Sequence, residues 1–170
     1  MTSILLFQLL EELSAFNSSN KLYYSVFSIE QLLKNVAISF AISLDTNEAD
    51  IEFSSSISDS LGEFTGDKIK LQELVLNLLK NAEEAITEQG SIHLAASRSG
   101  DIITITCTDT GCGITPEQME CIFQPFVTYK PGGTGLGLAF SRKIAEAHEG
   151  TLTAVSTPQE STTFTVTLPV

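Results

Sequence analysis

The sequence predicts an α/β (α+β) two-layer sandwich, in which a mixed, mostly antiparallel sheet is covered by three helices on one face. Three observations support this fold class. Stretches with helical periodicity and stretches rich in β-forming residues follow one another along the chain. Short turn sequences join neighbouring strands, which favours antiparallel pairing. In the last strand, apolar residues alternate with threonines, as in a sheet that is covered on one side.

Length, charge and cysteine content narrow the function classes. The chain of 170 residues is about one domain long and can bury a real core. Its formal net charge of −12 argues against nucleic acid and anionic membrane as partners, but local N–H groups and a metal can still hold a nucleotide. Three cysteines without Cys-x-x-Cys spacing indicate reduced thiols, without zinc or disulfides. We see no signal peptide and no apolar run of membrane length, so we expect a cytoplasmic domain; a membrane anchor of a full-length protein would lie outside this chain.

The first quarter of the chain predicts a helix, a short strand and a second helix. Residues 3–16 carry apolar residues at helical spacing, and the polar run 17–20 ends this helix. Residues 23–27 alternate and are rich in β-forming types, which predicts a strand. Ser28, with a glutamine three residues later, predicts the N-cap of a helix that continues to about Leu44.

The most pronounced helical pattern covers residues 68–87. Apolar residues at helical spacing give this helix a wide face for burial, and Asp67 is its predicted N-cap. Two plausible strands, over residues 51–55 and 61–65, precede it.

A polar stripe runs beside the apolar face of that helix. It contains Asn77, Asn81 and Glu84, because residues three and four apart share one side of a helix. Asparagine is a poor helix former, so two of them in a helix interior indicate a use that offsets their cost. For the asparagine pair alone, an ordinary solvated surface is the alternative.

A hairpin with strands over residues 91–97 and 101–108 follows a turn at residues 89–90. His93 is expected on the face opposite the apolar residues, as an exposed strand residue and not as a ligand or phosphate acceptor. Asp109 ends the second strand on its covered side, where a carboxylate needs a donor partner. An aspartate that merely caps a loop is the alternative.

The last third of the chain contains a long polar segment between two glycine clusters. A short helix from Thr115 to about residue 123 opens it, and a proline ends that helix. The glycines at both ends make the segment a possible lid, which we expect to be mobile. Thr134 is the predicted N-cap of a helix through Ala147, with Gly150 as its left-handed C-cap. The final strands are expected over residues 152–155 and 162–168.

Four blocks of sequence carry a resemblance to a known family. They are residues 77–82 (Asn-Leu-Leu-Lys-Asn-Ala), 109–114 (Asp-Thr-Gly-Cys-Gly-Ile), 123–126 (Phe-Gln-Pro-Phe) and 132–138 (Gly-Gly-Thr-Gly-Leu-Gly-Leu). In this order they resemble the N, G1, F and G2 boxes of the catalytic ATP-binding domain of sensor histidine kinases. That domain belongs to the superfamily shared with gyrase B, heat-shock chaperone and mismatch-repair ATPases. The subgroup with a Phe-Thr-x-Lys lid is the most similar, although residues 126–130 contain one residue more.

The resemblance covers roughly residues 28–170 and implies the Bergerat fold. We therefore expect residues 21–170 to form the ATP-binding catalytic domain. Residues 1–20 are expected to be the tail of a dimerisation helix, or an N-terminal helix that merely packs on the domain.

The resemblance also implies roles for individual residues. Asp109 would accept a hydrogen bond from the adenine amino group, and Asn81 would be the Mg²⁺ ligand, with Asn77 supporting the same stripe. Lys130 would be the lid cation that meets the γ-phosphate, and with Asn81 it forms the implied catalytic pair. Two glycines would let the backbone approach the base, and the second cluster would supply N–H groups to the phosphates. These implied nucleotide-binding residues are Gly111 and Gly113, and Gly133, Thr134, Gly135, Leu136, Gly137 and Leu138. Phe123 and Phe126 would anchor the lid, with core packing as the alternative.

Two departures from the hydrolytic relatives bear on the activity. Asn77 stands where those ATPases carry a glutamate general base, and an amide cannot take a proton from water. The acceptor motif of a dimerisation domain is absent, since the histidines are His93 and His148, and His148 is expected simply to end a helix.

The implied function is therefore the catalytic half of a protein-histidine kinase in a two-component phosphorelay. It would present the γ-phosphate of Mg²⁺·ATP to a histidine on a separate dimerisation domain, from which a response-regulator receiver domain takes the phosphate. An anti-sigma-factor-type serine kinase or binding module of the same fold is the main alternative. A degenerate scaffold without activity is a third.

Overall fold

The computed structural model describes residues 22–44, 49–130 and 133–170. The helix expected over residues 3–16, and with it the separate N-terminal unit 1–20, lies outside the described residues.

The described chain forms one five-stranded sheet and a small two-stranded ribbon. The strand order of the main sheet is β2-β4-β5-β7-β6, with β2 parallel to β4 and every other neighbouring pair antiparallel. Strands β1 and β3 pair with each other, away from the main sheet. The strands are β1 (Ser25–Ser28), β2 (Asp50–Ile57), β3 (Glu63–Gly66), β4 (Gln89–Ser99), β5 (Ile102–Asp109), β6 (Thr151–Thr157) and β7 (Ser161–Pro169).

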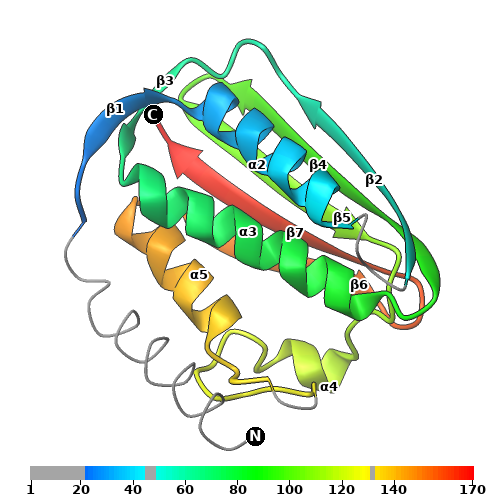
Figure 1. Ribbon diagram of the computed structural model, residues 1–170. Helices are drawn as coiled ribbons and strands as arrows, with labels where there is room; N and C mark the ends of the chain where they lie inside the picture. The colour runs from blue at the N-terminus through cyan, green and yellow to red at the C-terminus, as the bar shows by residue number, and fades with distance from the viewer. Residues whose placement is uncertain (1–21, 45–48, 131–132) are drawn as a thin grey trace, which may run out of the picture.

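Three helices cover one face of the sheet, with α3 in the middle (Figure 1). They are α2 (Ile29–Leu44), α3 (Lys68–Ala85) and α5 (Gly137–Ala147); the short α4 (Pro116–Met119) lies at one end of the molecule, near the start of α5. The mixed, mostly antiparallel sheet with three helices on one face confirms the predicted fold class.

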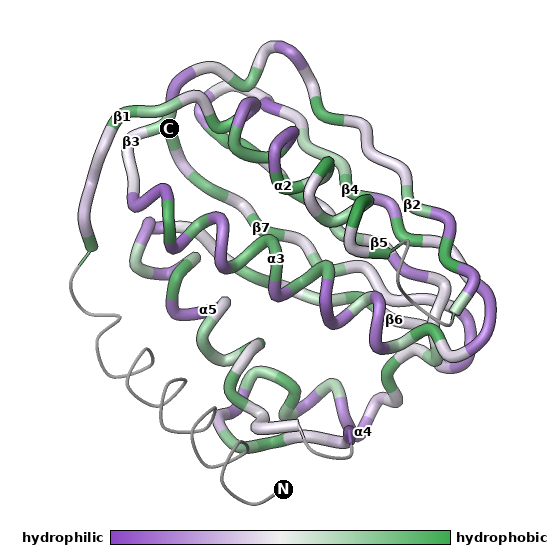
Figure 2. The backbone as a smooth tube through the Cα atoms, viewed as in Figure 1, coloured by the Kyte–Doolittle hydropathy of each residue, from purple (hydrophilic) through white to green (hydrophobic). Residues whose placement is uncertain are grey.

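The core lies between the three helices and the sheet. On α3, all the apolar residues of the predicted face from Leu71 to Ala82 are buried. Strand β7 alternates buried Phe164, Val166 and Leu168 with half-buried threonines, because one face of the sheet is left open. The helices are also two-sided: in Figure 2, hydrophobic and hydrophilic residues alternate along each of them. Among the described residues, no helix combines the length and apolar character needed to cross a membrane.

Local capping predictions hold at two helix starts. The Asp67 side chain accepts from the N–H of Lys70 at 3.1 Å, and Ser28 Oγ accepts from the N–H of Gln31 at 3.2 Å. Both side chains satisfy N–H groups that a first helical turn leaves without partners.

Other boundary predictions were wrong. Residues 89–90 are not a turn, because strand β4 already begins at Gln89 beside β2. Thr134 is not the N-cap of α5: Leu136 occupies that position, and Thr134 Oγ1 accepts from the Leu136 N–H at 3.4 Å. The left-handed residue after α5 is Glu149 (φ 59°) and not Gly150, where a Cβ would lie 2.1 Å from the Thr167 carbonyl oxygen.

His148 does more than end α5. It is buried, its Nδ1 lies 2.8 Å from the Ile144 carbonyl oxygen, and its Nε2 accepts from the Asp67 N–H at 2.9 Å. The imidazole therefore ties the end of α5 to the start of α3. His93 lies on the open face of the sheet, half-buried between Ser54 and Ser56.

Candidate functional site

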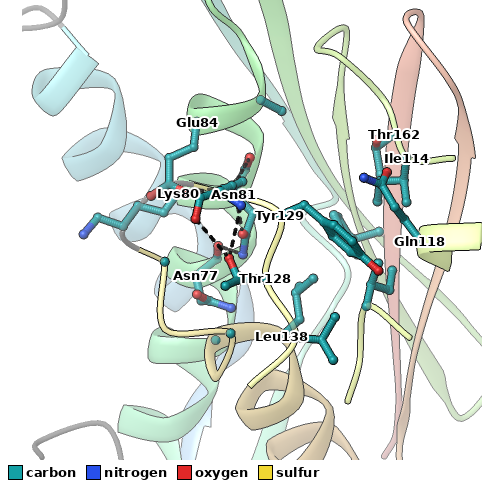
Figure 3. Close-up of a pocket in the computed structure, with 18 of the residues that line it drawn as sticks. Asn77, Lys80, Asn81, Glu84, Ile114, Gln118, Thr128, Tyr129, Leu138 and Thr162 are labelled. Carbon is teal, nitrogen blue, oxygen red and sulfur yellow. Dashed lines mark hydrogen bonds and ion pairs between the residues drawn. The ribbon is translucent and has the colours of Figure 1, made fainter. Parts of the chain in front are cut away.

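A cavity of about 510 Å³ opens where the C-terminal half of α3 and the start of α5 meet the ends of β5 and β7. Residues from the segment between α4 and α5 close another side of it. Most of the predicted site residues line this space: Asn77, Asn81, Asp109, Gly113, Lys130, Gly133, Thr134, Gly135, Gly137 and Leu138. Figure 3 shows Asn77, Asn81 and Glu84 along one wall, with Gln118 and Thr162 opposite.

The α3 wall is held in place by hydrogen bonds between side chains and backbone. Asn81 Nδ2 donates to the Asn77 carbonyl oxygen at 2.8 Å, which leaves the amide oxygen of Asn81 available for a cation. Asn77 Nδ2 donates to Ser141 Oγ on α5, also at 2.8 Å. A Cβ at Gly137 would lie 2.6 Å from Asn77 Oδ1, so glycine permits this close approach of α5 to α3.

Asp109, the last residue of β5, lines the cavity. Its side chain is buried, and Oδ1 accepts from the Gly111 N–H at 2.9 Å. Burial raises the pKa of this carboxyl, while the Gly111 N–H and the charge of Lys130 lower it. Thr162 of β7 is its direct partner across the sheet and is also buried. The cavity thus offers an acceptor and a hydroxyl side by side at one end.

The two glycines after β5 have different positions. Gly113 lines the cavity with φ 66°, and a Cβ there would lie 2.3 Å from the Thr157 carbonyl oxygen. Gly111 does not line the cavity: it packs against the last turn of α3, where a Cβ would lie 2.5 Å from the Ala85 carbonyl oxygen.

The second glycine cluster forms the entrance to α5. Leu136, the N-cap, is buried in the core and does not line the cavity, whereas its glycine neighbours do. Gly135 has φ 69°, and its carbonyl oxygen accepts from the Phe126 N–H at 2.9 Å. This bond fastens the preceding segment to the start of α5.

That segment carries a cation into the cavity. Lys130 Nζ lies 2.7 Å from Glu84 Oε2 and 3.3 Å from Asn81 Oδ1. The two implied lid anchors differ: Phe123 packs against the core, with its ring 6.5 Å from that of Phe164, whereas Phe126 is 61% exposed with φ 67°. Core packing thus accounts for Phe123 only.

The chain matches the family described as histidine kinase-, DNA gyrase B- and HSP90-like ATPase over residues 66–170. The chain belongs to this family. Within it, the match is to the ATP-binding catalytic domain of two-component sensor histidine kinases, as the following relatives show.

Among curated proteins, the sensor histidine kinase ZraS of Escherichia coli K12 is 41% identical over 129 residues, which cover 76% of this chain and 28% of ZraS. Sporulation kinase B of Bacillus subtilis is 44% identical over 105 residues, or 61% of this chain and 24% of that kinase. The chain therefore spans less than a third of the length of these kinases.

Solved structures show the same fold. Full-length ShkA in complex with AMPPNP aligns with a TM-score of 0.84 and 28% identity, over 96% of this chain and 35% of ShkA. The catalytic domain of histidine kinase ThkA, in a nucleotide-free form, aligns with a TM-score of 0.76 and 26% identity, over 86% of this chain and 95% of that domain.

Sequence reasoning about this ATP-binding domain missed several lining residues. Thr162 was counted only as a strand residue, because its place beside Asp109 depends on the β5–β7 register. Gln118 carried no pattern that pointed to a site, and Thr128 entered only as part of the Phe-Thr-x-Lys resemblance, without a role of its own. Glu84 was noticed on the polar stripe, and its position three residues after Asn81 was the available signal.

Proposed function

We propose that the cavity binds Mg²⁺·ATP and presents its γ-phosphate to a histidine on a separate dimerisation domain. One observation carries this proposal: a single cavity is lined by groups suited to each part of the nucleotide. The buried carboxylate of Asp109 lines it, and so do Lys130 and the amide oxygen of Asn81, which lie 3.3 Å apart. The glycine-rich start of α5 lines it as well. That arrangement matches the order of base, phosphates and metal in the nucleotide.

The base would bind at the Asp109 end. An ionised carboxylate only accepts hydrogen bonds, so it favours the amino group of adenine over the carbonyl oxygen of guanine. The Gly111 N–H holds one carboxylate oxygen and so orients the side chain. The neighbouring Thr162 hydroxyl lies within the same lining.

The phosphates would bind at the start of α5. The first turn of a helix leaves N–H groups without partners and carries the positive end of the helix dipole. Gly133, Gly135 and Gly137 line the cavity there, and at Gly137 the Asn77 side chain leaves no room for a Cβ. Lys130 adds a full positive charge, which can stabilise a transferring phosphoryl group.

The residues present also fit a magnesium ion. Asn81 Oδ1 is a hard oxygen donor, and the Lys130 ammonium lies 3.3 Å from it, so this oxygen already faces a cation. Asn81 would hold the ion, which neutralises phosphate charge when bound. Asn77 offers no base for activating water, and its amide is occupied by Ser141. Transfer to an external histidine is therefore favoured over hydrolysis.

Incubation with labelled ATP tests this function. The isolated chain is expected to bind ATP and to retain no label, whereas a histidine-bearing dimerisation domain from the same gene is expected to become labelled and to pass the label to a receiver domain. Phosphohistidine is lost in acid and stable in alkali, whereas phosphoserine is stable in acid. Acid-stable label on a partner protein would favour the serine-kinase alternative, and rapid hydrolysis by the isolated chain would refute both.

We further propose that the domain works in the cytoplasm, where ATP is available.

A further inference from the structure

We propose that Glu84 is a positioning residue of the phosphate end of the cavity. In the nucleotide-free chain it holds the Lys130 ammonium against Asn81, and ATP must take Lys130 away from it. This inference rests on the proposed Mg²⁺·ATP site and adds a residue to which no role has been given.

The geometry that carries the inference is a three-residue contact between α3 and the segment before α5. Lys130 Nζ contacts Glu84 Oε2 at 2.7 Å, Asn81 Oδ1 at 3.3 Å and the Asn81 carbonyl oxygen at 3.4 Å. Glu84 provides the shortest of the three contacts and the only negative charge among them. The carboxylate therefore decides where the ammonium rests.

The amide oxygen of Asn81 cannot serve both cations. If Asn81 Oδ1 held a magnesium ion, an ammonium on the same oxygen would face a dication at close range. Asn81 would therefore release Lys130 when it holds the metal of Mg²⁺·ATP. The released ammonium would then move from Glu84 toward the phosphates, so the Glu84 carboxylate and the γ-phosphate compete for one lysine.

The exposure of the pair suits an exchangeable contact. The Glu84 side chain is 53% exposed and that of Lys130 is 40% exposed, so water and salt screen the ion pair. An exposed ion pair of this kind contributes little free energy to the position of the lysine. Its loss should therefore change the equilibrium constant for nucleotide binding by roughly two- to fivefold. Such a contact positions the lysine in the empty chain without blocking the nucleotide.

The contact also ties the segment to the body of the domain. Lys130 N–H bonds to Thr128 Oγ1, and the Phe126 N–H bonds to the Gly135 carbonyl oxygen, so these bonds stay within the region between α4 and α5. The Lys130 side chain reaches across to α3. Removal of the Glu84 charge should therefore loosen residues 127–130 while leaving the rest of the domain unchanged.

Three variants test the proposal: Glu84→Gln, Lys130→Gln and the two combined. Glu73→Gln is the matched control, since Glu73 is on the same helix, pairs with Lys70 at 3.0 Å and does not line the cavity. In the nucleotide-free chain, Glu84→Gln should speed hydrogen exchange at residues 127–130, and Glu73→Gln should not. Calorimetry with Mg²⁺·AMPPNP should show affinity raised about two- to fivefold by Glu84→Gln, and less for Mg²⁺·ADP, which lacks the γ-phosphate. In the Lys130→Gln background, the gain should vanish.

Each contrary result has a definite meaning. A gain that persists without Lys130 would show that Glu84 acts only by long-range repulsion of the nucleotide, and would overturn the proposal. Weaker binding of Mg²⁺·AMPPNP by Glu84→Gln, with metal-free binding unchanged, would make Glu84 a metal ligand and would also overturn it. If the unmodified chain binds no nucleotide, the proposed function fails, whereas unchanged exchange in nucleotide-free Glu84→Gln refutes the positioning role alone.

Discussion

Substitution of Asp109 by asparagine is the sharpest test of the adenine end of the cavity. The side chain is buried, and Oδ1 accepts from the Gly111 N–H at 2.9 Å. An asparagine oxygen can keep that bond, so the new amide NH₂ group faces the cavity in place of the second carboxylate oxygen. A donor then meets the donor amino group of adenine.

The expected loss follows from the type of hydrogen bond removed. Bonds to charged groups contribute about 1.5–3 kcal/mol, which corresponds to roughly a 10- to 150-fold loss of affinity for an ATP analogue. Inosine triphosphate carries a carbonyl oxygen where ATP has its amino group, so Asp109→Asn should bind it no worse than the unmodified chain does. Calorimetry with both nucleotides measures the reversal, and the exposed Asp101 provides the control Asp101→Asn.

The same substitution has a predictable effect on stability. Burial raises the pKa of Asp109 above its usual value, so ionising it costs folding free energy as the pH rises from the unfolded-state pKa through the folded-state pKa. Asp109→Asn removes that cost, and the nucleotide-free domain should melt no lower than the unmodified domain at pH 7. The advantage should disappear below the usual carboxyl pKa, where both side chains are neutral.

Unchanged ATP affinity in a folded Asp109→Asn variant would refute the assignment of this cavity to adenine.

Three further predictions concern the metal, the segment before α5 and the backbone. Asn81→Ala should weaken binding of Mg²⁺·AMPPNP more than metal-free AMPPNP in calorimetry, because the lost group is a cation ligand; equal weakening would count against that role. Hydrogen exchange in the lid expected over residues 116–133 should be fast without nucleotide and slow with AMPPNP, and full protection of the empty chain would contradict a closing lid. Gly135→Ala should destabilise the domain by about 1–3 kcal/mol in denaturant unfolding, since φ is 69° and a Cβ would lie 2.6 Å from the Phe126 carbonyl carbon; an unchanged midpoint would show that the backbone relaxes there.

The sequence alone determined features that depend on residues close together in the chain. The apolar face of α3, its Asp67 cap and the polar stripe with Asn77 and Asn81 follow from helical spacing. The position of Asp109 at the covered end of β5 follows from strand alternation. Helical periodicity, strand alternation and capping depend on residues that are close together in the chain, so they can be predicted without the tertiary structure.

The tertiary structure alone decided the contacts between distant segments. The register of β5 against β7 put Thr162 beside Asp109, and packing on the last turn of α3 placed Gly111 outside the cavity. The Lys130–Glu84 contact joins residues 46 positions apart, and His148 reaches Asp67 across 81 positions. Such pairs depend on how the helices and the sheet pack together, because the sequence around one residue does not indicate which distant residue it will contact.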